Sequence, residues 1–169
     1  TRLLARAALR RAVRGALQRG EFALYYQPQV DMITGELVGA EALLRWRHDS
    51  LGMVPPGVFV PISEDLGLID EVGQWVIDNA CGQLRRWIDA GHQPPRVAVN
   101  LSPMQLSADL AVNWRRAIDG AGLTPELLEA ELTESCIMRD ERTSAVALQD
   151  LSRQGVQVSL DDFGTGHSS

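Results

Sequence analysis

Residues Glu41–Arg47 read EALLRWR and follow the short run VGA at positions 38–40. The segment is apolar enough to form a buried β-strand, but Glu41 interrupts it with a carboxylate. Burying a carboxylate is unfavourable unless its charge is compensated. Glu41 is therefore either paired with a neighbouring cation such as Arg45 or Arg47, or it helps to bind a cation from solution.

The bulk composition describes an acidic globular protein. The chain has 169 residues, 45% of them hydrophobic, and a formal net charge of −6. This length is sufficient for one domain with a hydrophobic core, and the acidic balance argues against a nucleic-acid partner bound by a basic face. An anionic substrate would need metal ions to reverse the local field. We find no apolar run of membrane-spanning length and no signal peptide. We interpret Cys81 and Cys136 as free thiols, which is typical of a cytoplasmic protein. The parent protein could still be membrane-anchored through regions outside this chain.

Outward from EALLRWR, strand-like and helix-like segments alternate. We expect strands near 23–30, 37–46, 96–100, 128–133 and 156–162, and a loop at 49–56. We expect helices over 2–19, 57–69, 69–90, 110–121 and 141–154, with a short helix after Ser102. Thr34-Gly35 predicts a hairpin that makes the first two strands antiparallel, whereas the later alternation indicates βα units and a parallel sheet. The predicted fold class is α/β, a modified TIM (β/α)8 barrel with an antiparallel first strand.

The number of strands leads to an expectation about completeness. A closed barrel of this type has eight strands and about 250 residues, and an open sheet would leave both edges unpaired. We expect about the first five strands to be present and the C-terminal third of the domain to be absent. Residues 1–19, rich in arginine, are interpreted as a helix that connects to an upstream domain; a membrane-surface helix is the alternative.

Acidic and amide side chains recur within or just after the predicted strands: Glu41, Asn100, Glu131, Glu134, Asp161 and Asp162. The C-terminal ends of parallel barrel strands share one face, so these side chains are expected to converge. All are oxygen donors, which suit Mg²⁺, Mn²⁺ or Ca²⁺ rather than zinc. Two adjacent aspartates could reach two different ions, and two-metal sites serve phosphoester hydrolysis.

Each of these residues also has a plainer interpretation. Asn100 could cap the helix that begins near Pro103, Glu131 and Glu134 could face solvent, and Asp161-Asp162 could be part of a turn. Their joint occurrence favours a metal site. Arg45 is a candidate for binding phosphate, since guanidinium matches phosphate geometry, and an ion pair with Glu41 is its alternative.

Five motifs in order carry a family resemblance. They are YYQPQVD at 25–31, GAEALLRWRH at 39–48, NLSPMQL at 100–106, ELTES at 131–135 and DDFGTGHSS at 161–169. The chain from about residue 16 onward resembles the EAL domain, the family of bacterial cyclic-di-GMP-specific phosphodiesterases. The resemblance implies a domain over 20–169 that hydrolyses cyclic di-GMP to linear pGpG with Mg²⁺ or Mn²⁺ in a two-metal site, with Ca²⁺ inhibitory.

The resemblance also implies roles for individual residues. Metal ligands would be Glu41, Asn100, Glu131, Asp161 and, for the second ion, Asp162. Glu41, Glu131 and Asp161 would thereby take part in catalysis, and Glu134 would anchor the DDFGTG loop. Nucleotide contacts would come from Gln27, Leu43 and Arg45. His167 stands where the family usually has tyrosine, in a loop that couples dimerisation to metal binding.

The lysine and glutamate that the family uses to act on the attacking water are not in this sequence. We therefore expect the 169-residue chain alone to be inactive, although the complete domain would be a phosphodiesterase. The alternative is a non-catalytic receptor or regulatory module for cyclic di-GMP. A homodimer and an upstream sensor or GGDEF-type domain are the further partners that the resemblance implies.

Overall fold

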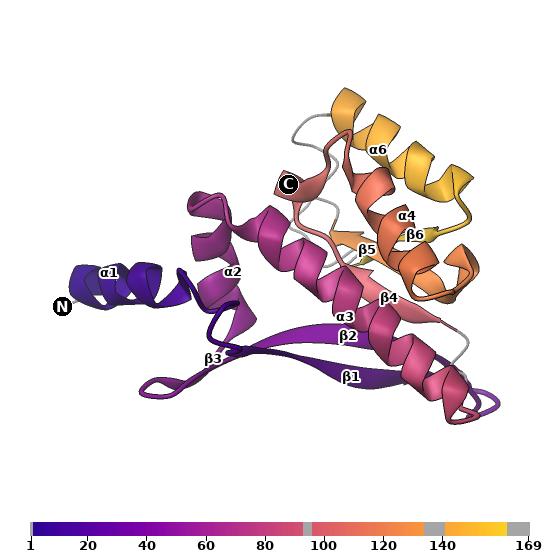
Figure 1. Cartoon of the computed structure of the whole chain (residues 1–169), viewed down its shortest axis with the longest axis horizontal. Coiled ribbons are helices and arrows are strands. Elements are labelled where there is room, and N and C mark those ends of the chain that lie inside the picture. The colour runs from indigo at the N-terminus through magenta and orange to yellow at the C-terminus, as the bar shows by residue number, and fades with distance from the viewer. Residues whose placement is uncertain (1, 93–95, 134–140, 162–169) are drawn as a thin grey trace.

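The computed structural model describes residues 2–92, 96–133 and 141–161, in which helices pack against one face of a mixed sheet (Figure 1). The strands are β1 (Phe22–Val30), β2 (Leu37–His48), β3 (Gly52–Val54), β4 (Val97–Asn100), β5 (Leu128–Thr133) and β6 (Gln157–Asp161). The helices are α1 (Arg2–Val13), α2 (Pro56–Asp65), α3 (Ile69–Asp89), α4 (Leu110–Gly120) and α6 (Glu141–Arg153), with 3-10 turns η1 (Pro103–Gln105) and η2 (Pro125–Leu127).

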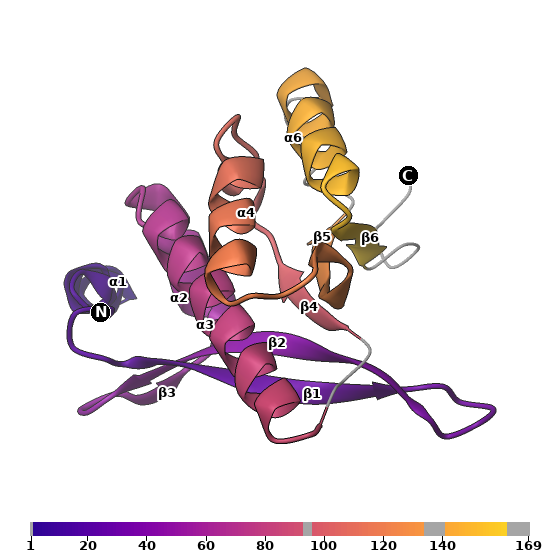
Figure 2. The ribbon, with the colours of Figure 1, turned by 45° about the vertical axis from the view of Figure 1, so that its right-hand side comes forward.

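The sheet order is β1-β2-β4-β5-β6, with β3 paired to β2. Strands β2, β4, β5 and β6 are mutually parallel, whereas β1 runs antiparallel to β2. Helices α3, α4 and α6 follow one another across the same side of this sheet, as Figure 2 shows. The α/β fold class and the antiparallel first strand are thus confirmed.

The β1–β2 hairpin is closed by a side chain. The Asp31 carboxylate accepts hydrogen bonds of 2.8 Å from the backbone N–H groups of Ile33 and Thr34, which also hold the pKa of Asp31 below its usual value. Gly35 completes the turn with a φ of 73°, a conformation that glycine adopts without strain. The hairpin predicted from Thr34-Gly35 is confirmed, and it aligns Gln27 with Glu41.

The segment predicted as a loop at 49–56 contains a strand, so this prediction was wrong in part. After β2, the His48 Nδ1 atom accepts backbone hydrogen bonds from Ser50 and Leu51, and the chain reverses into β3. Val54 of β3 pairs with Trp46 and is buried. A three-residue strand is too short to produce a visible alternation, so the sequence predicted five strands where the described sheet has six.

The predicted helix over 2–19 ends early, at Val13. Gly15 has a φ of 79°, which is incompatible with continuing the helix. The Arg19 guanidinium folds back and donates hydrogen bonds to the backbone oxygens of Ala12 and Arg14. These bonds satisfy carbonyl groups that the helix end leaves without a partner.

The hydrophobic core lies between the sheet and the helices. Phe22, Trp46 and Phe59 form an aromatic cluster, with the Phe22 and Phe59 ring centroids 5.6 Å apart. From α3, Ile77 and Leu84 are fully buried against the strands. Burial of each such side chain stabilises the fold by roughly 1.5–3 kcal/mol. Across the described residues, no helix combines the length and the apolar character needed to cross a membrane.

Candidate functional site

One face of the sheet carries the candidate polar side chains, and the helices cover the other. The register aligns Gln27 with Glu41, Glu41 with Ala98, and Asn100 with Glu131. Because side chains alternate along a strand, Gln27, Glu41, Asn100 and Glu131 project from the same face. Leu43 and Arg45 follow Glu41 on this face, since they are two and four residues further along β2.

Glu41 lies within β2 and not at the end of that strand, whereas Asn100 is the last residue of β4. β2 continues to His48, far beyond the three residues that pair with β4. It extends because its second half pairs with β1 and β3 instead. β4, by contrast, ends at Asn100, so the end of the short strand lies beside the middle of the long one.

Asn100 and Glu41 are in direct contact. The Asn100 Nδ2 atom donates a 2.7 Å hydrogen bond to Glu41 Oε1. The next residue, Leu101, donates its backbone N–H to the Glu131 carbonyl oxygen at 2.8 Å. These two bonds hold the ends of β4 and β5 and the middle of β2 at one place, with the amide oxygen of Asn100 available as a further oxygen donor.

The remaining members of the predicted metal set are only partly described. The backbone of Asp161 pairs with Thr133 at the end of β6, beside the strand that carries Glu131. Its side chain, and all of Asp162 and Glu134, lie outside the described residues. Among the side chains that the structure describes, no group of three or more His, Cys, Asp or Glu residues could hold a metal ion. Glu41, Asn100 and Glu131 carry side-chain oxygen atoms, the donor type that hard divalent cations prefer.

Arg45 lies four residues after Glu41 on β2, but its guanidinium forms other contacts. Within the described chain, neither Arg45 nor Arg47 forms an ion pair with Glu41. The Arg45 guanidinium donates to the Leu44 carbonyl oxygen at 3.2 Å and lies 5.8 Å from the ring centroid of Tyr25. A cation over an aromatic ring keeps its charge, so Arg45 can still bind an anion.

The turn after β4 contains polar residues that the sequence analysis did not assign to the site. Ser102, not Asn100, caps η1: its Oγ accepts from the Met104 N–H, and its own N–H donates to Gln105 Oε1. Ser102 Oγ also donates to Glu64 Oε1 at 2.6 Å. The sequence signal was present, because Ser-x-x-Gln at 102–105 is the capping-box pattern.

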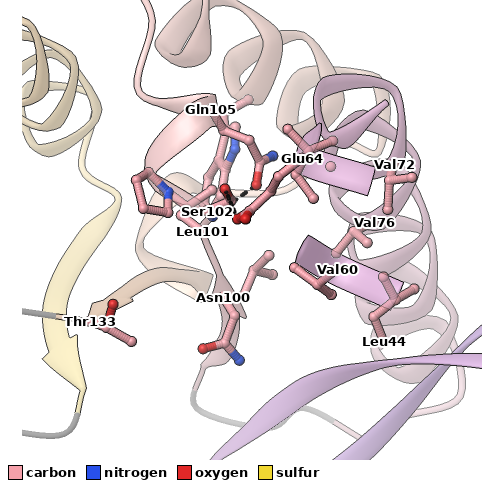
Figure 3. A pocket seen from close by; sticks show the side chains of 15 residues that line it. Leu44, Val60, Glu64, Val72, Val76, Asn100, Leu101, Ser102, Gln105 and Thr133 are labelled. Carbon is pink, nitrogen blue, oxygen red and sulfur yellow. Dashed lines mark hydrogen bonds between the residues drawn. The ribbon is translucent and has the colours of Figure 1, made fainter. Parts of the chain in front are cut away.

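A cavity of about 290 Å³ adjoins this turn, between α2, α3 and the ends of β4 and β5. Figure 3 shows Asn100 and Thr133 at one side of it and Val60, Val76 and Leu44 at the other. Apolar walls with a few polar groups are typical of sites for small organic ligands.

The mixed sheet, with its antiparallel first strand and its polar face, defines part of an α/β domain of the barrel type. A family model described as the EAL domain matches residues 9–169. The chain belongs to the EAL domain family.

Among known proteins, the chain is similar to the bifunctional diguanylate cyclase/cyclic di-GMP phosphodiesterase MucR of Pseudomonas aeruginosa. The two are 48% identical over 158 residues, which cover 93% of this chain and 23% of MucR. The cyclic di-GMP phosphodiesterase NbdA of the same organism is 40% identical over 158 residues, covering 93% of this chain and 20% of NbdA.

A solved structure of the MucR phosphodiesterase in complex with c-di-GMP has the same fold. Its TM-score is 0.89 at 47% identity, with 96% of this chain and 66% of that chain covered. The chain therefore spans about a quarter or less of the curated relatives and about two thirds of this solved domain.

Proposed function

We propose that this chain forms much of the active site of a metal-dependent cyclic-di-GMP phosphodiesterase. In this reaction water adds to one phosphorus atom and the bond from that phosphorus to one ester oxygen breaks. The displaced oxygen takes up a proton and becomes a ribose hydroxyl, so the ring opens to linear pGpG. The observation that carries the proposal is the contact of Asn100 with Glu41, together with the bond from Leu101 to Glu131. The likeness to MucR and NbdA supports cyclic di-GMP as the substrate.

Glu41, Asn100 and Glu131 would hold the metal ions together with Asp161 and Asp162. Their oxygen chemistry supports Mg²⁺ or Mn²⁺ as the resident ions, with Ca²⁺ as an inhibitor. Divalent ions at such a site lower the pKa of water and offset phosphate charge. The Asn100 amide keeps the Glu41 carboxylate oriented without neutralising it, because an amide carries no charge.

Arg45, Gln27 and Leu43 would contact the nucleotide. The guanidinium of Arg45 can form two parallel hydrogen bonds with phosphate oxygens, which orients the anion as well as binding it. Gln27 is exposed opposite Glu41, and Leu43 offers an apolar contact beside it. Glu134 would anchor the DDFGTG loop.

We propose that the whole protein is a cytoplasmic signalling protein that acts as a homodimer. Segment 1–19 would connect the domain to an upstream sensor or GGDEF-type domain. The bifunctional name of MucR, which includes a diguanylate cyclase, supports a multidomain arrangement.

The test is hydrolysis of cyclic di-GMP by the natural full-length protein with Mg²⁺, with Ca²⁺, and with Glu41→Ala. We expect pGpG with Mg²⁺, inhibition by Ca²⁺ and no product from the variant. Binding of the nucleotide without Mg²⁺-dependent turnover would overturn the enzyme and support the receptor instead.

A further inference from the structure

Most of the segment that follows Asn100 is buried although it leaves the sheet, Met104 being the exposed residue in it. Leu101 and Ser102 expose only 7% and 8% of their surface, and Gln105, three residues on, exposes 8%. Polar side chains at such depth are normally held by hydrogen bonds, since burying them without partners is unfavourable. The partners of Ser102 and Gln105 therefore determine where the end of β4 lies.

Ser102 and Gln105 first bond to each other. The Ser102 N–H donates to Gln105 Oε1 at 2.9 Å, and the Met104 N–H donates to Ser102 Oγ at 3.2 Å. This reciprocal capping box makes the turn from 102 to 105 a rigid unit. The unit begins only two residues after Asn100, so its position constrains the Asn100 backbone directly.

Glu64 attaches this unit to α2. Its Oε1 accepts the Ser102 hydroxyl at 2.6 Å, across 38 residues of sequence (Figure 3). Hydrogen bonds to a carboxylate are short and about twice as strong as those between neutral groups. The last turn of α2 is thereby joined to the end of β4.

The turn from 102 to 105 contacts α3 at Gly73. A Cβ atom at position 73 would overlap Gln105 Nε2 and would lie 2.8 Å from Gln105 Cδ. The Gln105 amide thus rests against the bare backbone of α3, where any side chain at position 73 would displace it. Gly82, on the same helix, has no such neighbour: a Cβ there would meet only Arg86 Nη1, at 3.8 Å.

We infer that Glu64, Gln105 and Gly73 are positioning residues, which act through Ser102 to hold Asn100 against Glu41. The inference rests on the proposed function for its metal consequence, since Asn100 and Glu41 are proposed ligands. Outer partners of ligating residues typically change metal affinity 10- to 100-fold when they are removed.

Two matched alanine variants on α3 test the inference. Gly73→Ala and Gly82→Ala raise the helix propensity of α3 by the same amount, but only the first displaces Gln105. In the natural full-length protein, the side-chain NH₂ signal of Asn100 is followed by NMR and assigned by its loss in Asn100→Ala. Affinity for Mn²⁺ alone is measured by calorimetry.

We expect Gly73→Ala to shift the Asn100 signal and weaken Mn²⁺ binding about 10- to 100-fold, while Gly82→Ala changes neither. Glu64→Ala should behave like Gly73→Ala, and Glu64→Gln, which keeps an acceptor oxygen, should restore most of the affinity. An unmoved Asn100 signal in Gly73→Ala, or a moved signal with unchanged Mn²⁺ affinity, would overturn the inference.

The result for the unsubstituted chain separates the two proposals. If it binds no Mn²⁺, the proposed metal site fails. The positioning of Asn100 is then decided by the NMR signal alone, which needs no metal.

Discussion

The Asn100 side-chain amide donates a 2.7 Å hydrogen bond to Glu41 Oε1 across 59 positions of sequence, and so joins the end of β4 to the middle of β2. The donor is neutral. It orients the carboxylate but leaves its negative charge uncompensated, which distinguishes this contact from an ion pair. We expect a divalent cation to bind a carboxylate held in this way.

Replacing Glu41 by glutamine removes the charge and keeps an acceptor for Asn100. We expect Mn²⁺ affinity to fall by about 100-fold or more, because loss of a ligand should exceed loss of an outer partner. Calorimetry with Mn²⁺ measures this. Glu129→Gln is the matched control: it lies two residues before Glu131 on β5, pairs with Arg96 at 3.5 Å, and should leave the affinity unchanged. Equal affinity in Glu41→Gln and the unsubstituted chain would exclude Glu41 as a ligand.

Asn100→Asp replaces the hydrogen-bond donor by a second carboxylate. Without metal, the two like charges repel, and the loss of this exposed hydrogen bond should reduce the free energy of unfolding by about 0.5–1.5 kcal/mol. Divalent ions should stabilise this variant more than the unsubstituted chain, because they bind only the folded pair. Thermal denaturation of both proteins, first with a chelator and then with Mg²⁺, measures the loss of stability and its recovery by the ion. A variant destabilised equally in both conditions would argue against a cation at this position.

Arg45→Ala tests the phosphate contact. Losing a hydrogen bond to a charged partner costs about 1.5–3 kcal/mol, so cyclic di-GMP should bind roughly 10- to 100-fold more weakly to the full-length protein. Arg85→Ala is the control, since Arg85 is engaged with Asp89 on α3 and lies on the helical side of the sheet. Isothermal titration measures both. Weakening of similar size in the two variants would indicate a general charge effect instead of a contact.

Glu21 makes folding sensitive to acid. Its carboxylate accepts from Arg19 Nε at 2.6 Å and from the buried Trp46 Nε1 at 2.9 Å, and the Arg19 bond is the main cause that lowers the pKa of Glu21. A lowered folded-state pKa contributes stability above the ordinary value of 4.5, and that contribution disappears as the pH falls through the folded-state value.

The variant Glu21→Gln should therefore be less stable than the unsubstituted chain near neutral pH, and this difference in stability should shrink as the pH falls below 4.5 and through the lowered folded-state pKa of Glu21. Urea denaturation across this range measures the gap. A gap that stays constant with pH would show that the charge of Glu21 contributes nothing.

Tyr26 makes folding sensitive to base. Its ring packs edge-on against Trp87 with centroids 4.8 Å apart, and burial raises the pKa of Tyr26 from 10.0 to about 12. The folded state favours the neutral phenol of Tyr26. The contribution of this phenol to folding stability is therefore complete below pH 10 and is lost as the pH rises through about 12.

Tyr26→Phe cannot ionise and should unfold at higher pH than the unsubstituted chain. Burial also raises the pKa of Cys81 to about 12, but both proteins share this thiol, so the difference isolates Tyr26. Circular dichroism during alkaline titration measures the midpoints. Identical midpoints would contradict the prediction.

Local pattern predicted most of the architecture. The helix over Ile69–Asp89 has a strong 3.6-residue periodicity, and the strands around Glu41 and Asn100 are short apolar runs typical of a buried parallel sheet. Thr34-Gly35 marks a turn by its own chemistry. The same reasoning missed β3 and placed the end of α1 too late. A three-residue strand has no period to detect, and α1 ends where Gly15 and the returning side chain of Arg19 override an alanine-rich pattern.

By itself, the sequence determined the fold class, the hairpin and the oxygen-donor character of the site, because each follows from residue types at short range. Only the tertiary structure decided that the end of β4 meets the middle of β2, since the register of parallel strands depends on how their apolar faces pack against distant helices. It also brought Glu64 to Ser102 and Gly73 to Gln105, contacts between segments 38 and 32 positions apart. Such contacts depend on how helices pack across the sheet, and no local periodicity encodes them.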